Sequence, residues 1–180
     1  MLLGIETVVI APGITAFSPF DFVRYPWTHS LVMCALWALG MAALYWLLRR
    51  NVVAATLIGV VVLSHWFLDA LVHRPDLPLT PGSDVKIGFG LWNSVLGTLL
   101  VEIALFALGL GLYLAGSRGS DRRGRYGLWA LVVLLFIAYT GAAFGPPPPS
   151  VATVAWAGLL GGLVTVVLGY WIDRHRSAKG

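Results

Sequence analysis

The stretch that decides the fold reads VVAATLIGVVVLSHWFLDALVHRPD and occupies residues 52–76. It begins with an apolar run close to the length, about 20 residues, that a helix needs to cross a bilayer. The end of the run carries two histidines and two aspartates, which are His65, Asp69, His73 and Asp76. Ionisable groups in a membrane helix are costly and usually have a partner or a task. The stretch therefore indicates a membrane protein and, within it, a candidate site.

The composition of the whole chain indicates the same class. Of 180 residues, 58% are hydrophobic and 11% are charged, whereas soluble domains carry about a quarter charged residues. The formal net charge of +4 does not indicate nucleic-acid binding, because no basic patch alternates with exposed aromatic residues. Cys34 is the single cysteine, so neither an intrachain disulfide nor a thiolate metal site is expected.

Apolar segments of spanning length predict an all-α bundle of five transmembrane helices. Together they form a single integral membrane domain over residues 1–180, in which residues 1–29 lead in from the outer face. Because a tight turn at Asn51 joins the first two helices, we expect these to pack as an antiparallel pair. The predicted helices are residues 30–48, 52–73, 88–115, 126–144 and 150–172.

Basic residues predict the orientation. If five helices alternate, nine lysines and arginines fall on one side of the membrane and three on the other. The richer side is expected to be cytoplasmic, which makes this a multi-pass protein of the cytoplasmic membrane with a cytoplasmic carboxyl terminus. The polar end of the 52–73 helix then lies at the outer face.

A divalent-metal site is the chemistry that the polar end favours. His65, Asp69 and His73 are four residues apart and lie along one helical stripe. His29 opens the preceding helix at the same membrane edge. Imidazole and carboxylate groups suit zinc and similar ions, so His29, His65 and Asp69 are the predicted metal ligands. His73 and Asp76 are alternatives, or groups that orient the ligands.

Two short motifs carry a resemblance to a known family. They are YPWTHSL at residues 25–31 and SHxxxD at residues 64–69. In this order and spacing, the chain resembles the membrane-bound, metal-dependent hydrolase-like family of bacterial inner-membrane proteins over residues 17–95. The resemblance implies metal-assisted hydrolysis.

The amino terminus departs from that family. Its members usually begin with a Gly-His pair and a further apolar segment that carries an aspartate, and this chain has neither. Residues 1–6 resemble the tail of such a segment. We therefore expect an amino-terminally truncated member whose site lacks one or two ligands.

The first of two hypotheses is a hydrolase embedded in the membrane. A metal would activate water for attack on an ester or a phosphoester, and membrane lipids or lipid-linked molecules are natural substrates for a site at this depth. His73, Asp76 or Asp84 would serve as general base.

The second hypothesis is a protein without enzymatic activity, either a small transporter or an oligomeric scaffold subunit. His65, Asp69 and Glu102 would then form a proton path or link neighbouring helices. Glycines permit close helix approach in a homo-oligomer. Those of the last predicted helix are Gly158, Gly161 and Gly162.

Overall fold

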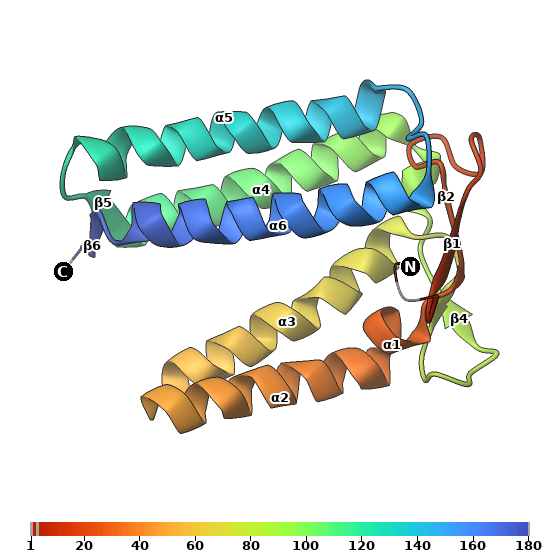
Figure 1. Cartoon of the computed structure of the whole chain (residues 1–180), viewed down its shortest axis with the longest axis horizontal. Coiled ribbons are helices and arrows are strands. Elements are labelled where there is room, and N and C mark those ends of the chain that lie inside the picture. The colour runs from red at the N-terminus through yellow and green to blue at the C-terminus, as the bar shows by residue number, and fades with distance from the viewer. Residues whose placement is uncertain (1, 3, 180) are drawn as a thin grey trace. The chain divides into compact units, whose positions relative to one another are not determined.

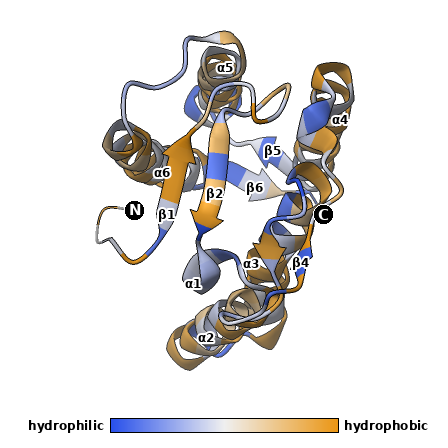
Figure 2. Ribbon diagram, turned by 90° about the vertical axis from the view of Figure 1, so that its right-hand side faces the viewer, coloured by the Kyte–Doolittle hydropathy of each residue, from blue (hydrophilic) through white to orange (hydrophobic). Residues whose placement is uncertain are grey.

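The computed structural model describes residues 2 and 4–179 (Figure 1). Among them, five helices are long and apolar enough to cross a membrane, which confirms the predicted fold class and the predicted number of spans. The hydrophobic residues run along these helices, as Figure 2 shows. The helices are α2 (Leu31–Arg49), α3 (Val52–Val72), α4 (Val95–Gly116), α5 (Arg122–Phe144) and α6 (Val151–Asp173).

The shorter elements lie in the segments before, between and after these helices. Three antiparallel strand pairs join β1 (Thr7–Ile10) to β2 (Phe20–Arg24), β3 (Leu77–Pro78) to β4 (Lys86–Ile87), and β5 (Ser117–Gly119) to β6 (Arg176–Ala178). A short helix, α1 (Pro26–His29), precedes α2, and a 3-10 turn, η1 (Leu91–Asn93), precedes α4. The chain forms two compact units, Met1–Thr98 and Leu99–Gly180, and each is described by itself.

The first unit is built on the packed pair α2 and α3. Arg50 ends α2 in a left-handed conformation, with φ of 54°, and the Asn51 side chain caps α3 by accepting from the Ala54 amide at 3.0 Å. Small residues let the helices approach each other, because a Cβ built on Gly59 would lie 3.3 Å from the Ala42 Cβ. The two helices are therefore in close contact at Gly59 and Ala42.

The end of α3 is covered by the chain that leads into α4. The Phe89 amide donates to the Ala70 carbonyl at 2.8 Å, and the Gly90 amide donates to the His73 carbonyl at 2.7 Å. These bonds satisfy carbonyls that a helix end leaves without intrahelical partners. Gly88 passes so close that a Cβ there would meet the Arg74 carbonyl.

This covering segment corrects one predicted helix boundary. The helix expected from residue 88 begins at Val95, because residues 88–94 bond to α3 and then form η1. Gly90 enters that turn with φ of +72°, a conformation that favours glycine. At the fourth span the opposite occurs: α5 begins at Arg122, before the expected residue 126, because Asp121 caps it by accepting from the Gly124 amide at 2.8 Å.

The second unit contains α5, α6, most of α4 and the β5–β6 pair. Polar side chains link its helices near both ends. Tyr113 donates to Asp173 at 2.9 Å, and Tyr139 donates to Glu102 at 2.8 Å. Glu102, one of the residues considered for a proton path, thus has a hydroxyl partner on the neighbouring helix.

Candidate metal centre

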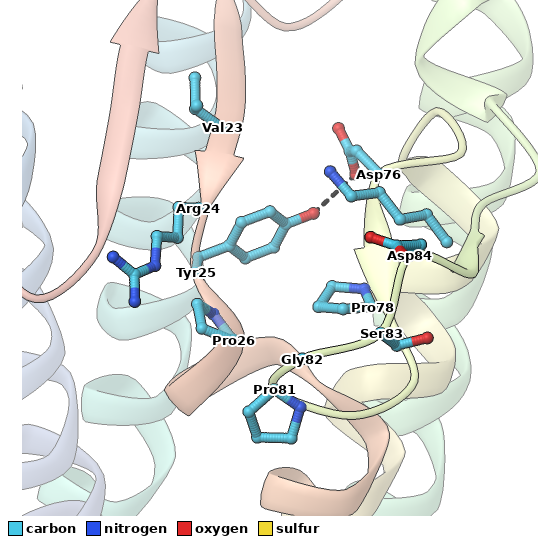
Figure 3. A pocket seen from close by; sticks show the side chains of 11 residues that line it. Val23, Arg24, Tyr25, Pro26, Asp76, Pro78, Pro81, Gly82, Ser83 and Asp84 are labelled. Atoms are coloured by element: carbon cyan, nitrogen blue, oxygen red, sulfur yellow. Dashed lines mark hydrogen bonds between the residues drawn. The ribbon is translucent and has the colours of Figure 1, made fainter.

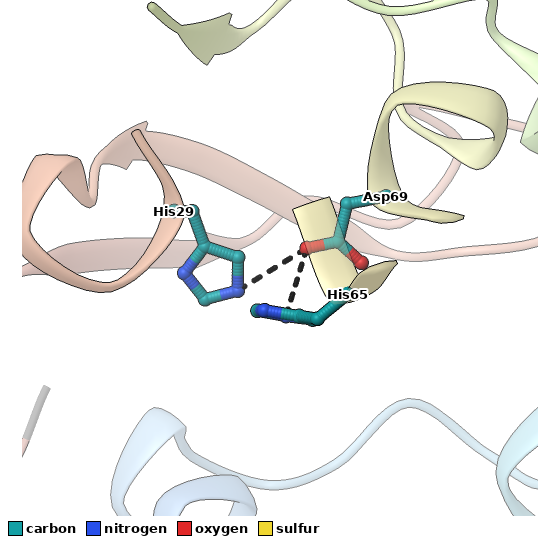
Figure 4. Close-up of side chains that lie close together, drawn as sticks. All are labelled: His29, His65 and Asp69. Carbon is teal, nitrogen blue, oxygen red and sulfur yellow. Dashed lines mark ion pairs between the residues drawn. The ribbon is translucent and has the colours of Figure 1, made fainter. Parts of the chain in front are cut away.

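Three side chains from two helices meet at one end of the first unit (Figure 4). His29 is the last residue of α1, and His65 and Asp69 lie one turn apart on α3. Asp69 Oδ2 is 3.0 Å from His65 Nε2 and 3.5 Å from His29 Nε2. One ligand atom from each residue lies within 4.8 Å of the others. The structure therefore brings together the three residues that the sequence nominates as metal ligands.

The shared carboxylate oxygen has an unusual environment. Asp69 Oδ2 is buried and has no hydrogen-bond partner of good geometry among the described residues. A buried oxygen left in this state costs free energy. Two imidazole nitrogens lie close to this oxygen, and two nitrogens with one carboxylate oxygen form a donor set that suits a divalent cation. The residues present therefore fit a metal ion.

The two histidines differ in exposure. The side chain of His65 is 48% exposed and that of His29 is 23% exposed. Burial lowers the pKa of the His29 imidazole, although Asp69 opposes this effect. The neutral imidazole, which has a free nitrogen lone pair for a metal, is thereby favoured at His29, while His65 leaves one side of the cluster open.

Hydrogen bonds from α2 hold the short helix α1 in place. The Cys34 thiol donates to the Thr28 carbonyl at 3.1 Å, and the Trp37 indole donates to the Trp27 carbonyl at 2.9 Å. Ser30 caps α2 by accepting from the Met33 amide. These contacts fix the end of the α1 backbone from which the His29 side chain extends.

His73 and Asp76 lie apart from this cluster, in a buried network of their own. Asp76 Oδ1 accepts from the Tyr25 hydroxyl at 2.6 Å and lies 3.0 Å from His73 Nδ1. Arg74 contacts the other Asp76 oxygen at 3.3 Å and also pairs with Asp21. His73 is 3% exposed and Asp76 is 5% exposed. The predicted stripe does not reach His73, because α3 ends at Val72 and His73 is its extended cap.

The network borders a cavity of about 240 Å³ (Figure 3). Tyr25 points across it toward Asp76, and Asp84 lies on the opposite loop with Lys86 and Arg24 also in the lining. Asp84, the third residue considered as a general base, thus shares a cavity with Asp76. The Tyr25 ring also contacts the His29 ring, with centroids 5.0 Å apart. Tyr25 is therefore the residue that connects the network to the metal candidates.

Asp76 gives the network a defined pH dependence. Burial acts to raise the pKa of this carboxyl, but hydrogen bonds from His73, Tyr25 and Arg74 outweigh burial and lower it. A lowered folded-state pKa stabilises the fold above the unfolded-state value and loses that contribution as pH falls through the folded-state value.

We expect the free energy of unfolding of the wild type, relative to Asp76→Asn, to be constant above the ordinary carboxyl pKa of 3.8. Below that value the difference should shrink progressively, because the unfolded carboxyl is already protonated while the folded one still ionises. Unfolding in detergent micelles, followed between about pH 7 and pH 2, measures this difference across the range of carboxyl titration. A difference in free energy of unfolding between the wild type and Asp76→Asn that stays constant over this pH range would contradict the lowered pKa of Asp76.

Tyr25 and Glu6 are two residues near the site that sequence reasoning missed. Tyr25 stood inside the YPWTHSL motif, but its partner Asp76 is 51 residues away. Glu6 was the one acidic residue in the apolar start of the chain, which is the only signal that could have drawn attention to it. Thr28, also within that motif, lies inside α1 and contacts Glu6.

The spans and the His/Asp cluster define a polytopic membrane protein with a polar site at one helix end. The family described as YdjM inner membrane protein matches residues 16–146. The chain belongs to this family, and it is a multi-pass protein of the bacterial cytoplasmic membrane. The matched range includes the three residues of the candidate metal centre. Neither the curated proteins nor the solved structures contain a match.

Proposed function

We propose that the protein is a metal-dependent hydrolase embedded in the membrane, with His29, His65 and Asp69 as ligands of a divalent ion such as zinc. The observation that carries this proposal is the position of Asp69 Oδ2, buried without a good hydrogen bond and 3.0 and 3.5 Å from two imidazole nitrogens. An ion bound there would polarise a substrate oxygen and lower the pKa of a water molecule toward neutrality.

The surroundings of His65 favour an amphipathic substrate. A cavity of about 290 Å³ lies beside this residue and is lined by Thr28, Cys34, Trp37, Val62 and His65. Most of these side chains are apolar, so the cavity suits a hydrocarbon chain next to a hydrolysable group. An ester or phosphoester linked to a lipid matches this combination of an apolar wall and a polar cluster.

We assign His73 and Asp76 a positioning role. A general base must reach the proton that it removes, and the 3% and 5% exposure of these residues leaves little room for a substrate. Their contacts instead hold Tyr25, whose ring packs against His29. The network would therefore act on the reaction by fixing the orientation of a metal ligand.

The distribution of basic residues supports a site at the outer face. Nine of the twelve lysines and arginines lie on the side opposite the cluster if the helices alternate, and such an excess is typical of the cytoplasmic side. The substrate would then be approached from the outer leaflet, and the carboxyl terminus would be cytoplasmic.

Metal-dependent hydrolysis tests the proposal. The protein in nanodiscs is stripped with a chelator, reloaded with zinc, manganese or magnesium, and given carboxylic esters, phosphomonoesters and phosphodiesters with and without acyl chains. We expect the wild type to hydrolyse an acyl-bearing substrate after it is reloaded with metal and not while it is stripped. His65→Ala should lose this hydrolysis, whereas the control His175→Ala, which alters a pair with Asp121 in the second unit, should retain it.

Two outcomes would overturn the hydrolase proposal. One is a wild-type rate that never exceeds the rate of His65→Ala on any substrate. The other is transport of a solute by the wild type in proteoliposomes that persists in His65→Ala without any hydrolysis, which would instead support the non-enzymatic class.

A further inference from the structure

Glu6 reaches from the turn before β1 to the start of α1. Its Oε1 atom accepts hydrogen bonds from the amides of Trp27 at 3.0 Å and Thr28 at 2.8 Å. Its Oε2 atom accepts from the Thr28 hydroxyl at 2.7 Å. The β1–β2 pairing brings Thr7 opposite Arg24, which places Glu6 beside α1. One carboxylate thus contacts both the backbone of α1 and a side chain next to His29.

The Thr28 hydroxyl, which contacts Glu6, also contacts the His29 ring. Its oxygen lies 2.5 Å from His29 Nδ1. A hydroxyl has one hydrogen to donate, and an ionised carboxylate can only accept. Since the Thr28 hydrogen is directed to Glu6, the Thr28 oxygen must accept from His29, so Nδ1 carries the imidazole hydrogen.

The hydrogen on Nδ1 determines the state of the other ring nitrogen of His29, Nε2. With the hydrogen on Nδ1, Nε2 of the neutral imidazole has a lone pair, and Nε2 is the atom 3.5 Å from Asp69 Oδ2. Two electron-rich atoms facing each other across this distance repel each other unless a proton or a metal ion lies between them. The tautomer imposed by Glu6 and Thr28 is therefore the one that binds a metal through Nε2.

We propose that Glu6 and Thr28 are positioning residues that hold His29 as the Nδ1–H tautomer and thereby raise the affinity of the centre for a divalent ion. The effect on affinity rests on the metal centre proposed above, but the tautomer itself does not. A purely structural role, in which Glu6 caps α1, would need only the bonds from Oε1 to the two backbone amides. The contact between Oε2 and the Thr28 hydroxyl is what distinguishes the two roles.

Glu6→Gln separates these roles sharply. The glutamine carbonyl can keep both amide bonds and so preserve the cap, which places the side-chain NH₂ at the Thr28 hydroxyl. That group donates where the carboxylate accepted. The Thr28 hydrogen is then free to point at His29 Nδ1, which moves the imidazole hydrogen to Nε2 and blocks the metal-binding nitrogen.

The first measurement is ¹⁵N NMR of the metal-free protein with labelled histidine, in which His29 is assigned from a His29→Asn variant. We expect the Nδ1–H tautomer in the wild type and in Thr28→Ser, which keeps the hydroxyl. Glu6→Gln should shift toward the Nε2–H tautomer, and Thr28→Val should lose the preference. The Nε2–H tautomer in the wild type would overturn the proposal whether or not any metal binds.

The second measurement is zinc affinity by competition with a chromophoric chelator. We expect Glu6→Gln and Thr28→Val to bind zinc about 10- to 100-fold more weakly, the usual effect of removing a group that orients a metal ligand. Thr28→Ser and the control Glu102→Gln, in the second unit, should match the wild type. Thermal unfolding should change little in Glu6→Gln, because the cap is kept.

The outcomes separate this inference from the proposed function. If the wild type binds zinc and both variants bind it equally well, the positioning role is wrong and the metal centre stands. If the wild type binds no zinc, the metal centre is wrong and so is the effect on affinity, whereas the NMR result still decides the tautomer.

Discussion

Asp69→Asn should weaken zinc binding by more than about 100-fold, beyond the range caused by loss of an orienting contact. The substitution keeps the size and shape of the side chain but removes the negative charge from the oxygen that both histidines face. It also introduces an amide NH₂ group, which donates hydrogen bonds, at a position where a cation needs an electron-pair donor. Competition with a chromophoric chelator measures the change on protein in detergent or nanodiscs.

Asp173→Asn is the matched control for this measurement. Like Asp69, Asp173 lies on a spanning helix, but it belongs to the second unit. Its carboxylate accepts a hydrogen bond from the Tyr113 hydroxyl at 2.9 Å. Its substitution should leave zinc affinity unchanged. Equal affinity in wild type and Asp69→Asn would remove Asp69 from the ligand set.

Gly88→Ala should destabilise the first unit by about 3 kcal/mol, the upper part of the range for overpacking a tightly filled position. A Cβ at this position would meet the carbonyl groups of Arg74 and His73. The backbone cannot move away freely, because the Phe89 and Gly90 amides bond to the end of α3. Unfolding in mixed micelles measures the loss.

Gly82→Ala provides the control, because Gly82 lies in the loop between β3 and β4 and no atom outside its immediate neighbours is within 4 Å of a Cβ built there. It should change the free energy of unfolding by no more than about 0.5 kcal/mol, as is usual for surface substitutions. Similar losses in both variants would mean that the close approach at Gly88 does not hold the end of α3.

The spans were predictable from sequence because hydropathy and helix length are local properties. The start of α4 was not, although the letters GFGLW at residues 88–92 look like the beginning of an apolar helix. Their backbone bonds go to residues 70 and 73, and hydropathy does not register a partner so far away in the chain. The residues that cover the end of one helix were therefore assigned to the next.

The convergence of the candidate ligands was predictable for a related reason. Spacing on one helix placed His65 beside Asp69, and the short turn after α2 brought His29 to the same end. His73 continued that spacing in sequence, but α3 ends one residue before it, so its side chain joins Asp76 instead. Glu6 could not be placed, because its position depends on the register of the β1–β2 pair.

Elemental analysis of the wild-type protein, purified without affinity metals, reloaded with zinc and dialysed, tests the metal centre most directly. We predict one tightly held ion per chain, which His65→Ala and Asp69→Asn lose and His175→Ala retains. A wild type that holds no more zinc than His65→Ala and Asp69→Asn would contradict the metal centre and the hydrolase proposed on it.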